Sequence, residues 1–473
     1  MARQLLMGDV IRSAAARMPN RTAIAHEDSS LTFAQLNERA EELAQRLLIA
    51  GVCRGDRIAW RAVTSVESAI VYSAAALIGA IFVPINPAYT TAEEARILGH
   101  ADPKVYLQLG PGGVGIDCSN LPAPTCIVDL PEVSEDDPVA IFYTSGTTGE
   151  PKGCLLTHRS ERIRAGSGEA CPQGATVCMF PQFHMASWSF SLRTWLSGDA
   201  MVYVPRADAE YLLAAVSRHK ANHLYCVPAV WRRILDFDRR PYDLSSLRAV
   251  DTGTSAVTVE MLRELRDVFP DCQIRVIYGS TECGMVCVLG TDHLFSKPSS
   301  VGCPAPGVEV RIDEQSQMWV RSPAVFPGYF RNEEATRAAL VHDWYGTGDL
   351  AVRDSEGFYS IIGRASEIIR TGGETVAPVE VDSVLQSHPD LSDGAVAGIP
   401  HPEWGEVIVA FVVPRVGATT TLDGLREYCR RTLAPHKLPR DLVLLDKLPR
   451  TGATRQIVRS QLVSMYTLKN CEV

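Results

Sequence analysis

The chain has 473 residues, 46% hydrophobic and 21% charged, a balance that supports a sizeable core and more than one domain. A formal net charge of −9 argues against a nucleic-acid partner, which would need a basic face. Thirteen cysteines without paired spacing indicate reduced thiols, and the first residues lack a secretory signal, so we expect a cytoplasmic protein. The longest uncharged run, residues 68–92, contains two prolines and is unsuited to spanning a membrane.

Strand and helix signals alternate along the chain. Residues 32–48 carry apolar side chains at helical spacing, with Thr32 as a candidate N-terminal cap. The segments that follow are strands over 57–60 and 81–85, a helix over 68–79, a glycine- and proline-rich connection over 110–138, strands over 200–204, 223–227, 248–251 and 274–277, and a hairpin over 308–321. Such alternation predicts parallel sheets with helices on their faces.

Residues 143–153 combine hydroxyls, glycines and a lysine directly after the apolar residues 139–142. Glycines let backbone N–H groups approach an anion, hydroxyls add donors, and Lys152 adds a positive charge. The Gly-x-x-x-x-Gly-Lys-Ser/Thr spacing of a Walker loop is absent, so the nucleotide-binding fold that carries that loop is not implied. We predict a flexible strand-to-helix loop that closes on phosphates.

Two later segments place carboxylates near hydroxyls and aromatic rings. Tyr278, Thr281 and Glu282 follow an apolar run, and Asp349 lies in the segment 344–350. A carboxylate beside a hydroxyl can hold Mg²⁺ and contact a phosphate, and an aromatic ring can stack on a base. A carboxylate also has two oxygens that can accept from a vicinal diol.

These segments resemble the motifs of the adenylate-forming superfamily, which includes acyl-CoA synthetases, aryl-CoA ligases, peptide-synthetase adenylation domains and luciferases. The matching segments, in the superfamily's order, are 143–158, 278–282, 344–350 and 363–367. The resemblance therefore covers nearly the whole chain.

The resemblance implies an α/β fold with a large N-terminal domain, in which parallel sheets are flanked by helices beside a β-subdomain. A small, mobile α+β domain would follow at the C-terminus. We expect the domains to comprise residues 1–365 and 366–473, with the hinge near Ser366. A small polar residue at a hinge permits large changes of φ and ψ.

The resemblance also assigns roles to single residues. Tyr278 would lie on adenine, Thr281 on the α-phosphate, Glu282 on magnesium, Asp349 on the ribose hydroxyls, and Arg364 beside ribose and phosphate. The full nucleotide site is Thr144, Ser145, Gly146, Thr147, Thr148, Gly149, Lys152, Tyr278, Gly279, Thr281, Asp349 and Arg364. The acyl pocket is expected from His184, Trp188, Gly253, Thr254, Ser255, Cys283 and Gly284, whose sizes suit a compact or aryl acid.

The chain departs from the superfamily near its C-terminus. Relatives carry a catalytic lysine in a Leu-Pro-Arg-Thr-x-x-Gly-Lys loop, whereas the segment 448–459 is one residue longer and has Arg455 and Gln456 at the two possible lysine positions. Glutamine cannot neutralise the charge between two reacting anions. Arg455 could, because a guanidinium binds carboxylate and phosphate well. A drifted lysine position and a lysine removed by mutagenesis are the other interpretations.

The resemblance implies a two-step ligation that uses ATP and Mg²⁺. A small carboxylic acid forms an acyl-adenylate, with Lys152, Thr281, Glu282 and Arg455 or Gln456 as catalytic residues, and a thiol of CoA or of a carrier protein's phosphopantetheine then displaces AMP. Two alternatives stay open. One is a relative with altered chemistry, such as amide formation or ATP-dependent diazotisation, and the other is a non-catalytic nucleotide-binding protein.

Overall fold

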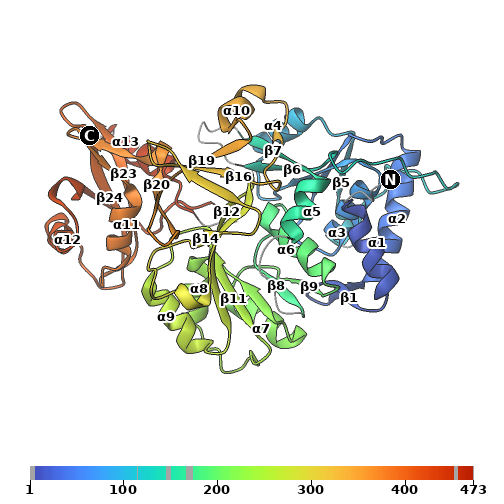
Figure 1. The fold of residues 1–473 in the computed structure, drawn as a ribbon, viewed down its shortest axis with the longest axis horizontal. Helices are drawn as coiled ribbons and strands as arrows, with labels where there is room; N and C mark the ends of the chain where they lie inside the picture. The colour runs from blue at the N-terminus through green and yellow to red at the C-terminus, as the bar shows by residue number, and fades with distance from the viewer. Residues whose placement is uncertain (1–5, 114, 145–150, 167–173, 452–455, 472–473) are drawn as a thin grey trace.

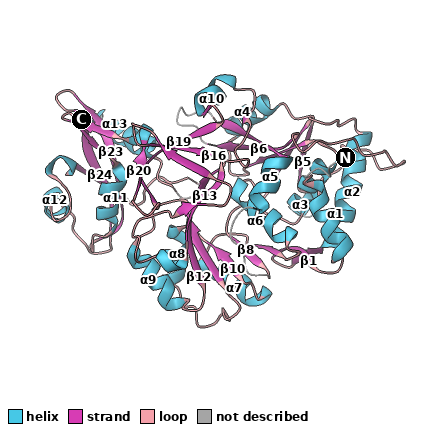
Figure 2. Ribbon diagram, in the orientation of Figure 1, coloured by secondary structure: helices cyan, strands magenta, loops and turns pink. Residues whose placement is uncertain are grey.

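The structure is a computed structural model that describes residues 6–113, 115–144, 151–166, 174–451 and 456–471. Four sheets organise the chain (Figures 1 and 2). The largest has nine strands, in the order β14 (Cys303–Pro304), β13 (Gly284–Leu289), β12 (Gln273–Ser280), β11 (Ala249–Gly253), β10 (His223–Tyr225), β8 (Thr176–Cys178), β9 (Met201–Tyr203), β1 (Thr22–His26) and β2 (Ser29–Thr32). The strands from β12 to β1 are parallel to one another.

A second sheet has six strands and carries the glycine-rich segment. Its order is β17 (Gly328–Tyr329), β7 (Lys152–Thr157), β6 (Pro138–Thr144), β4 (Ile81–Ile85), β3 (Arg57–Arg61) and β5 (Val105–Gln108). β6, β4, β3 and β5 are parallel, whereas β7 and β17 run antiparallel to their neighbours. This alternation of parallel strands with helices confirms the α/β prediction.

Helices cover these two sheets and pack between them. They are α1 (Gly8–Arg17), α2 (Phe33–Ile49), α3 (Glu67–Leu77), α4 (Thr91–Ala101), α5 (His158–Gly166), α6 (Met185–Leu196), α7 (Ala209–His219), α8 (Pro228–Asp236) and α9 (Val259–Val268). α2 begins at Thr32 as predicted, because the Thr32 hydroxyl accepts from the backbone of Gln35 while the Gln35 side chain accepts from the backbone of Thr32. Every residue of α3 is buried, in keeping with a sequence that carries no charged residue after Glu67 at its first position.

A smaller antiparallel sheet joins the two large ones. It contains β15 (Glu309–Ile312), β16 (Gln317–Arg321), β19 (Trp344–Arg353), β18 (Leu340–Val341) and β20 (Tyr359–Arg364), with α10 (Glu333–Ala339) beside it. β15 and β16 form the predicted hairpin over 308–321. One hydrophobic cluster extends from Met7 to Tyr359, so this β-subdomain shares the core of the larger N-terminal domain.

The C-terminal part has a sheet and hydrophobic clusters of its own. Its elements are β21 (Ile369–Thr371), β22 (Glu374–Val376), α11 (Pro378–Gln386), β23 (Leu391–His401), β24 (Gly405–Pro414), α12 (Leu422–Cys429), β25 (Asp441–Leu444) and α13 (Arg459–Cys471). Figure 1 shows this smaller α+β domain, orange to red, at one end of the molecule. Short 3₁₀ turns lie at Pro111–Gly113, Thr291–His293, Ala365–Glu367 and Pro435–Lys437. Within the described residues, no helix has the length and apolar composition needed to cross a bilayer.

Candidate active site

The glycine-rich segment joins two antiparallel strands, so the prediction of a strand-to-helix loop is wrong. Thr144 at the end of β6 pairs with Lys152 at the start of β7, and the Thr144 hydroxyl donates to the Lys152 carbonyl at 3.5 Å. α5 begins only at His158, after β7. The predicted phosphate-binding residues between these strands, Ser145, Gly146, Thr147, Thr148 and Gly149, lie outside the described residues.

Lys152 and Glu282 both lie against Tyr329. The Tyr329 hydroxyl donates to Glu282 Oε1 at 3.0 Å, and Lys152 Nζ lies 5.3 Å from the centre of the Tyr329 ring. Burial, and next the negative charge of Glu282, raise the pKa of the Tyr329 hydroxyl, so it stays a donor. Sequence reasoning missed Tyr329, because its role depends on β17 pairing with β7.

The turn that carries Thr281 and Glu282 rests on a buried arginine of α5. Arg164 Nη1 donates to the Thr281 carbonyl at 2.9 Å, and Nη2 donates to the Glu282 carbonyl at 3.0 Å. The Glu282 carbonyl also accepts from the backbone of Phe326 at 2.7 Å. Arg164 is a second residue that sequence reasoning missed.

Tyr278, Asp349 and Arg364, three of the residues predicted to bind the nucleotide, form a second cluster. The Tyr278 hydroxyl donates to Asp349 Oδ2 at 2.5 Å, and Arg364 Nε lies 2.8 Å from Asp349 Oδ1. Asp349 and Arg364 face each other in the register of β19 and β20. Burial raises the pKa of Asp349, although the Arg364 charge and the Tyr278 hydrogen bond oppose this shift. Gly279, which follows Tyr278, lies at an irregularity between β12 and β13.

The predicted acyl pocket begins at the end of β11. Gly253 has φ +151°, and a Cβ there would lie 2.0 Å from the Ile277 carbonyl oxygen. Thr254 has φ +71°, a strained conformation for a β-branched residue, and its hydroxyl lies 2.9 Å from the Tyr225 hydroxyl. Ser255 is exposed. Strained backbone is thus concentrated at this strand end.

Cys283 and Gly284 lie where β13 starts, beside the Glu282 turn. Cys283 Sγ is 3.2 Å from the Ser280 hydroxyl, and burial raises the pKa of this thiol to about 11. Cys283 is therefore a neutral, unreactive side chain at neutral pH. Gly284 has φ +69°, a conformation that favours glycine.

His184 lies at the N-terminus of α6. Its Nδ1 accepts from the backbone of Ala186 at 3.2 Å, and its ring stacks on Phe180 with 4.9 Å between ring centres. Burial lowers the pKa of His184 to about 4, so the imidazole is neutral. A capping, neutral histidine can shape an acyl pocket but brings no positive charge to it.

Trp188 is a core residue in the structure, and its predicted place in the acyl pocket stays a prediction. It is 0% exposed, its ring stacks on Tyr72 with 4.4 Å between ring centres, and its Nε1 donates to the Gln182 carbonyl at 2.7 Å. The ring also packs edge-on against Phe82 of β4. Trp188 thus belongs to the core between the two large sheets.

Gln456 connects the C-terminal domain to Thr254, one of the residues predicted to form the acyl pocket. Its Nε2 donates to the Thr254 carbonyl at 2.9 Å, and its backbone exchanges hydrogen bonds with Thr451 at 3.0 and 2.8 Å. Arg455, the other candidate for the lysine position, lies outside the described residues. Of the two candidates, the structure thus describes Gln456, whose neutral amide lies at the pocket.

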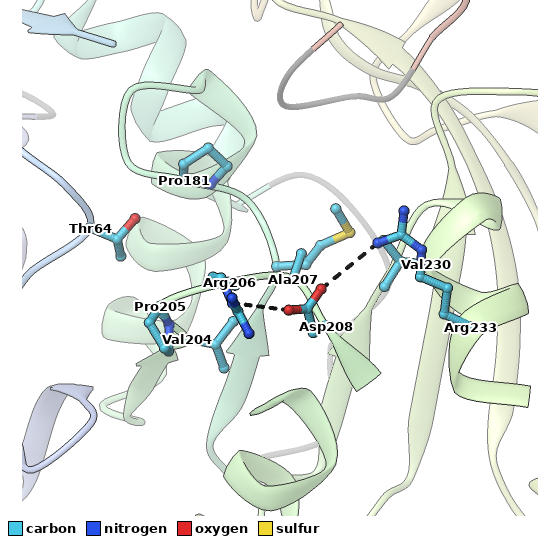
Figure 3. Close-up of a pocket in the computed structure, with 10 residues that line it drawn as sticks. Thr64, Pro181, Val204, Pro205, Arg206, Ala207, Asp208, Val230 and Arg233 are labelled. Atoms are coloured by element: carbon cyan, nitrogen blue, oxygen red, sulfur yellow. Dashed lines mark ion pairs between the residues drawn. The ribbon is translucent and has the colours of Figure 1, made fainter. Parts of the chain in front are cut away.

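A separate cavity of about 270 Å³ is lined by residues that include Thr64, Val204 and Val230 (Figure 3). Figure 3 shows Asp208 between Arg206, at 3.0 Å, and Arg233, at 3.8 Å. Met179 and Pro181 belong to its wall and precede His184 in sequence. Among the residues that the structure describes, none of those predicted to bind the nucleotide lines this cavity.

Carboxylates suited to a metal are sparse at the site. In the described ranges, no three His, Cys, Asp or Glu side chains come together as a metal cage. Mg²⁺ that is held by one carboxylate and by nucleotide phosphates needs no such cage. Glu282, whose Oε1 is oriented by Tyr329, fits this kind of site.

Comparison with known proteins identifies the family of the chain. The family model described as AMP-binding enzyme matches residues 11–330, and the one described as AMP-binding enzyme C-terminal domain matches residues 380–455. Feruloyl-CoA synthase from an Amycolatopsis species is 32% identical, over 93% of this chain and 95% of the relative. The o-succinylbenzoate CoA synthetase from Bacillus subtilis has been solved with its acyl-adenylate intermediate (28% identity, TM-score 0.85, 96% of this chain and 97% of that chain). The same synthetase has been solved with ATP and magnesium ion (27% identity, TM-score 0.85, 96% and 98%). The resemblance predicted from the sequence is confirmed, and the chain belongs to the AMP-binding enzyme family.

Proposed function

We propose that this protein is an AMP-forming carboxylic acid ligase that uses ATP and Mg²⁺ to activate a small or aryl acid and then passes the acyl group to CoA. The proposal rests on the residues at the end of β12. Tyr278 near the end of this strand contacts Asp349, and Glu282 in the turn after it contacts Tyr329. A carboxylate suited to a diol and one suited to a metal therefore lie along one short stretch of backbone. This arrangement suits a nucleotide, whose ribose offers a diol and whose phosphates bring a metal.

Each cluster has a role in holding the nucleotide. Asp349 accepts the ribose hydroxyls with the lone pairs that Tyr278 and Arg364 leave available, since two carboxylate oxygens offer about four acceptor sites. The Tyr278 ring lies on adenine, Glu282 binds Mg²⁺, and Lys152 holds the β- and γ-phosphates. Thr281 and residues 144–149 supply further donors to the phosphates.

The reaction has two steps. A carboxylate oxygen of the acid attacks the α-phosphorus, the bond from that phosphorus to the bridging oxygen breaks, and pyrophosphate leaves. The thiolate of CoA then attacks the carbonyl carbon of the acyl-adenylate, and AMP leaves with the bonding electron pair. Mg²⁺ neutralises phosphate charge when bound. The contribution of this chain is to position the reacting groups and to supply fixed donors.

Gln456 sets the expected rate of the first step. Its neutral amide holds the C-terminal loop at Thr254 but supplies no charge to the reacting anions. Losing a positioned charge of this kind costs roughly 3 kcal/mol of transition-state stabilisation. We expect slow acyl-adenylate formation unless Arg455 provides the charge.

We propose that the domains comprise residues 1–365 and 366–473, with Ser366 as the hinge. Two observations support this boundary: β20 ends at Arg364 in the third sheet, and the separate C-terminal hydrophobic clusters begin at Ile369. In addition, Arg459 of α13 pairs with Glu367 at 2.8 Å, so the chain is tied to the small domain directly after the hinge. A folded fragment of residues 1–365 should therefore bind ATP, as calorimetry can measure.

The free thiols of the described cysteines are in keeping with a reducing compartment, and we propose a cytoplasmic location. The test of the activity is pyrophosphate release with ATP, Mg²⁺ and a panel of acids that includes ferulate and short aliphatic acids. CoA, a carrier-protein phosphopantetheine and simple amines are compared as acceptors, with products identified by mass. Acid-dependent pyrophosphate release and a CoA thioester are expected. An amide as the sole product, or nucleotide binding without acid-dependent release, would overturn the proposal.

A further inference from the structure

Arg164 makes an unusual set of contacts beneath the Thr281–Glu282 turn. Besides the carbonyls of Thr281 and Glu282, its guanidinium donates to the Ala324 carbonyl from Nε at 2.9 Å and from Nη2 at 2.7 Å. Three carbonyls from two separate loops thus converge on one side chain. A guanidinium can serve them together because it offers five N–H donors in a rigid plane.

The positive charge of Arg164 is buried together with a carboxylate. The side chains of Arg164 and Glu161 are 2% and 0% exposed, and Arg164 Nη1 lies 3.6 Å from Glu161 Oε1. Both residues lie on α5, one turn apart. A buried charge without a partner is strongly unfavourable, so each of the two makes burial of the other tolerable.

The turn also packs directly on the arginine side chain. A Cβ at Gly284 would lie 3.1 Å from Arg164 Cγ, and the Thr281 carbonyl accepts as well from Cys154 Sγ of β7 at 3.6 Å. On the other side, the Ala324 contact fixes the loop that leads into β17 and Tyr329. Arg164 therefore holds both the backbone of Glu282 and the segment whose hydroxyl orients the Glu282 carboxylate.

We propose that Arg164 is a positioning residue that sets the Glu282 carboxylate for Mg²⁺, with Glu161 as its buried counter-ion. This inference rests on the proposed function, in which Glu282 binds the metal. Groups that orient a metal ligand from behind typically change metal affinity by about 10–100-fold when they are replaced. Arg164 acts on the metal through the backbone of Glu282 and does not touch it.

Calorimetric titration of the full-length protein with ATP, at graded Mg²⁺ concentrations, tests the inference. Arg164→Lys keeps the charge but loses the planar fork, so it should need about 10–100-fold more Mg²⁺ for tight ATP binding. Its affinity for ATP without Mg²⁺ should equal that of the parent. Arg159→Lys is the matched control, because Arg159 lies on the same helix with its side chain 43% exposed and pairs with Asp136 at the surface.

Two further variants separate the possible outcomes. Glu282→Gln reports on the proposed function: if its Mg²⁺ dependence equals that of the parent, the metal role of Glu282 is wrong. If Glu282→Gln shifts the dependence and folded Arg164→Lys does not, only the inference about Arg164 is overturned. Should Arg164→Lys fail to fold, the double variant Glu161→Leu with Arg164→Met removes both buried charges together. If the folded double variant needs more Mg²⁺ than the parent for tight ATP binding, the inference is supported, and an unchanged Mg²⁺ requirement overturns it.

Discussion

Replacing Asp349 with alanine removes a carboxylate that accepts from Tyr278 at 2.5 Å and pairs with Arg364 at 2.8 Å. In the nucleotide complex, the two ribose hydroxyls would lose their acceptor, at a cost of roughly 1–3 kcal/mol. This corresponds to a dissociation constant about 5–150-fold higher. Asp349→Ala should lower folding stability less than the loss of a fully buried ion pair would, because the Arg364 side chain is 46% exposed and water can solvate it.

Isothermal calorimetry with AMP and with ATP and Mg²⁺ measures this effect. The affinities for AMP and for ATP should fall by the same factor, because both nucleotides contain the ribose. Asp354→Ala is the matched control, since Asp354 follows β19, is exposed and pairs with Lys297 instead. If folded Asp349→Ala binds both nucleotides as tightly as the parent, Asp349 is not the ribose acceptor.

Three further predictions follow from the same geometry. Gln456→Lys places a cation near Thr254, so it should speed acyl-adenylate formation, measured as pyrophosphate release. Thioester formation from supplied acyl-adenylate should stay unchanged. Pyrophosphate release no faster than that of the parent would refute this prediction. Tyr329→Phe keeps the ring under Lys152 but loses the hydrogen bond to Glu282. About tenfold more Mg²⁺ should therefore be needed for ATP binding, with little change in melting temperature. An unaltered Mg²⁺ requirement would argue against an orienting role of Tyr329. His158 accepts a backbone N–H at Nδ1, and burial lowers its pKa to about 4. The unfolded chain, with a His pKa of about 6.5, therefore binds the proton first, and stability should fall by up to about 3 kcal/mol as the pH drops from about 6.5 to about 4. Urea unfolding at both pH values should show a smaller fall in the free energy of unfolding for His158→Asn than for the parent. An equal fall in both proteins would contradict the role of His158.

The predicted acyl pocket shows that the type of a side chain does not by itself tell whether the residue lies in a pocket or in the core. The family resemblance predicts His184, Trp188 and Cys283 as pocket residues. In the structure His184 caps α6, Trp188 is a core residue, and Cys283 is a buried neutral thiol. An aromatic or small side chain has the same sequence signal in a pocket wall and in a core, because both environments are apolar.

The glycine-rich segment shows a similar limit at the level of local structure. Residues 152–157 contain a short apolar run after Gly153, and a run of this kind fits a strand and the start of a helix equally well. Pairing with β6 on one side and β17 on the other decided for the strand. Strand formation depends on partners that lie far along the chain, and local sequence does not show them.

The sequence by itself determined the features that depend on short stretches: the alternation of strands and helices, the Thr32 cap, and the order of the motifs that contain Lys152, Glu282 and Asp349. Caps and turns join residues a few positions apart, so their signals are local. The tertiary structure alone decided which side chains hold these motifs in place. Tyr329 reaches Glu282 across 47 positions, Arg164 reaches Thr281 across 117, and Gln456 reaches Thr254 across 202. Such contacts arise because separate sheets pack around one core, and no local pattern of residues records where those sheets meet.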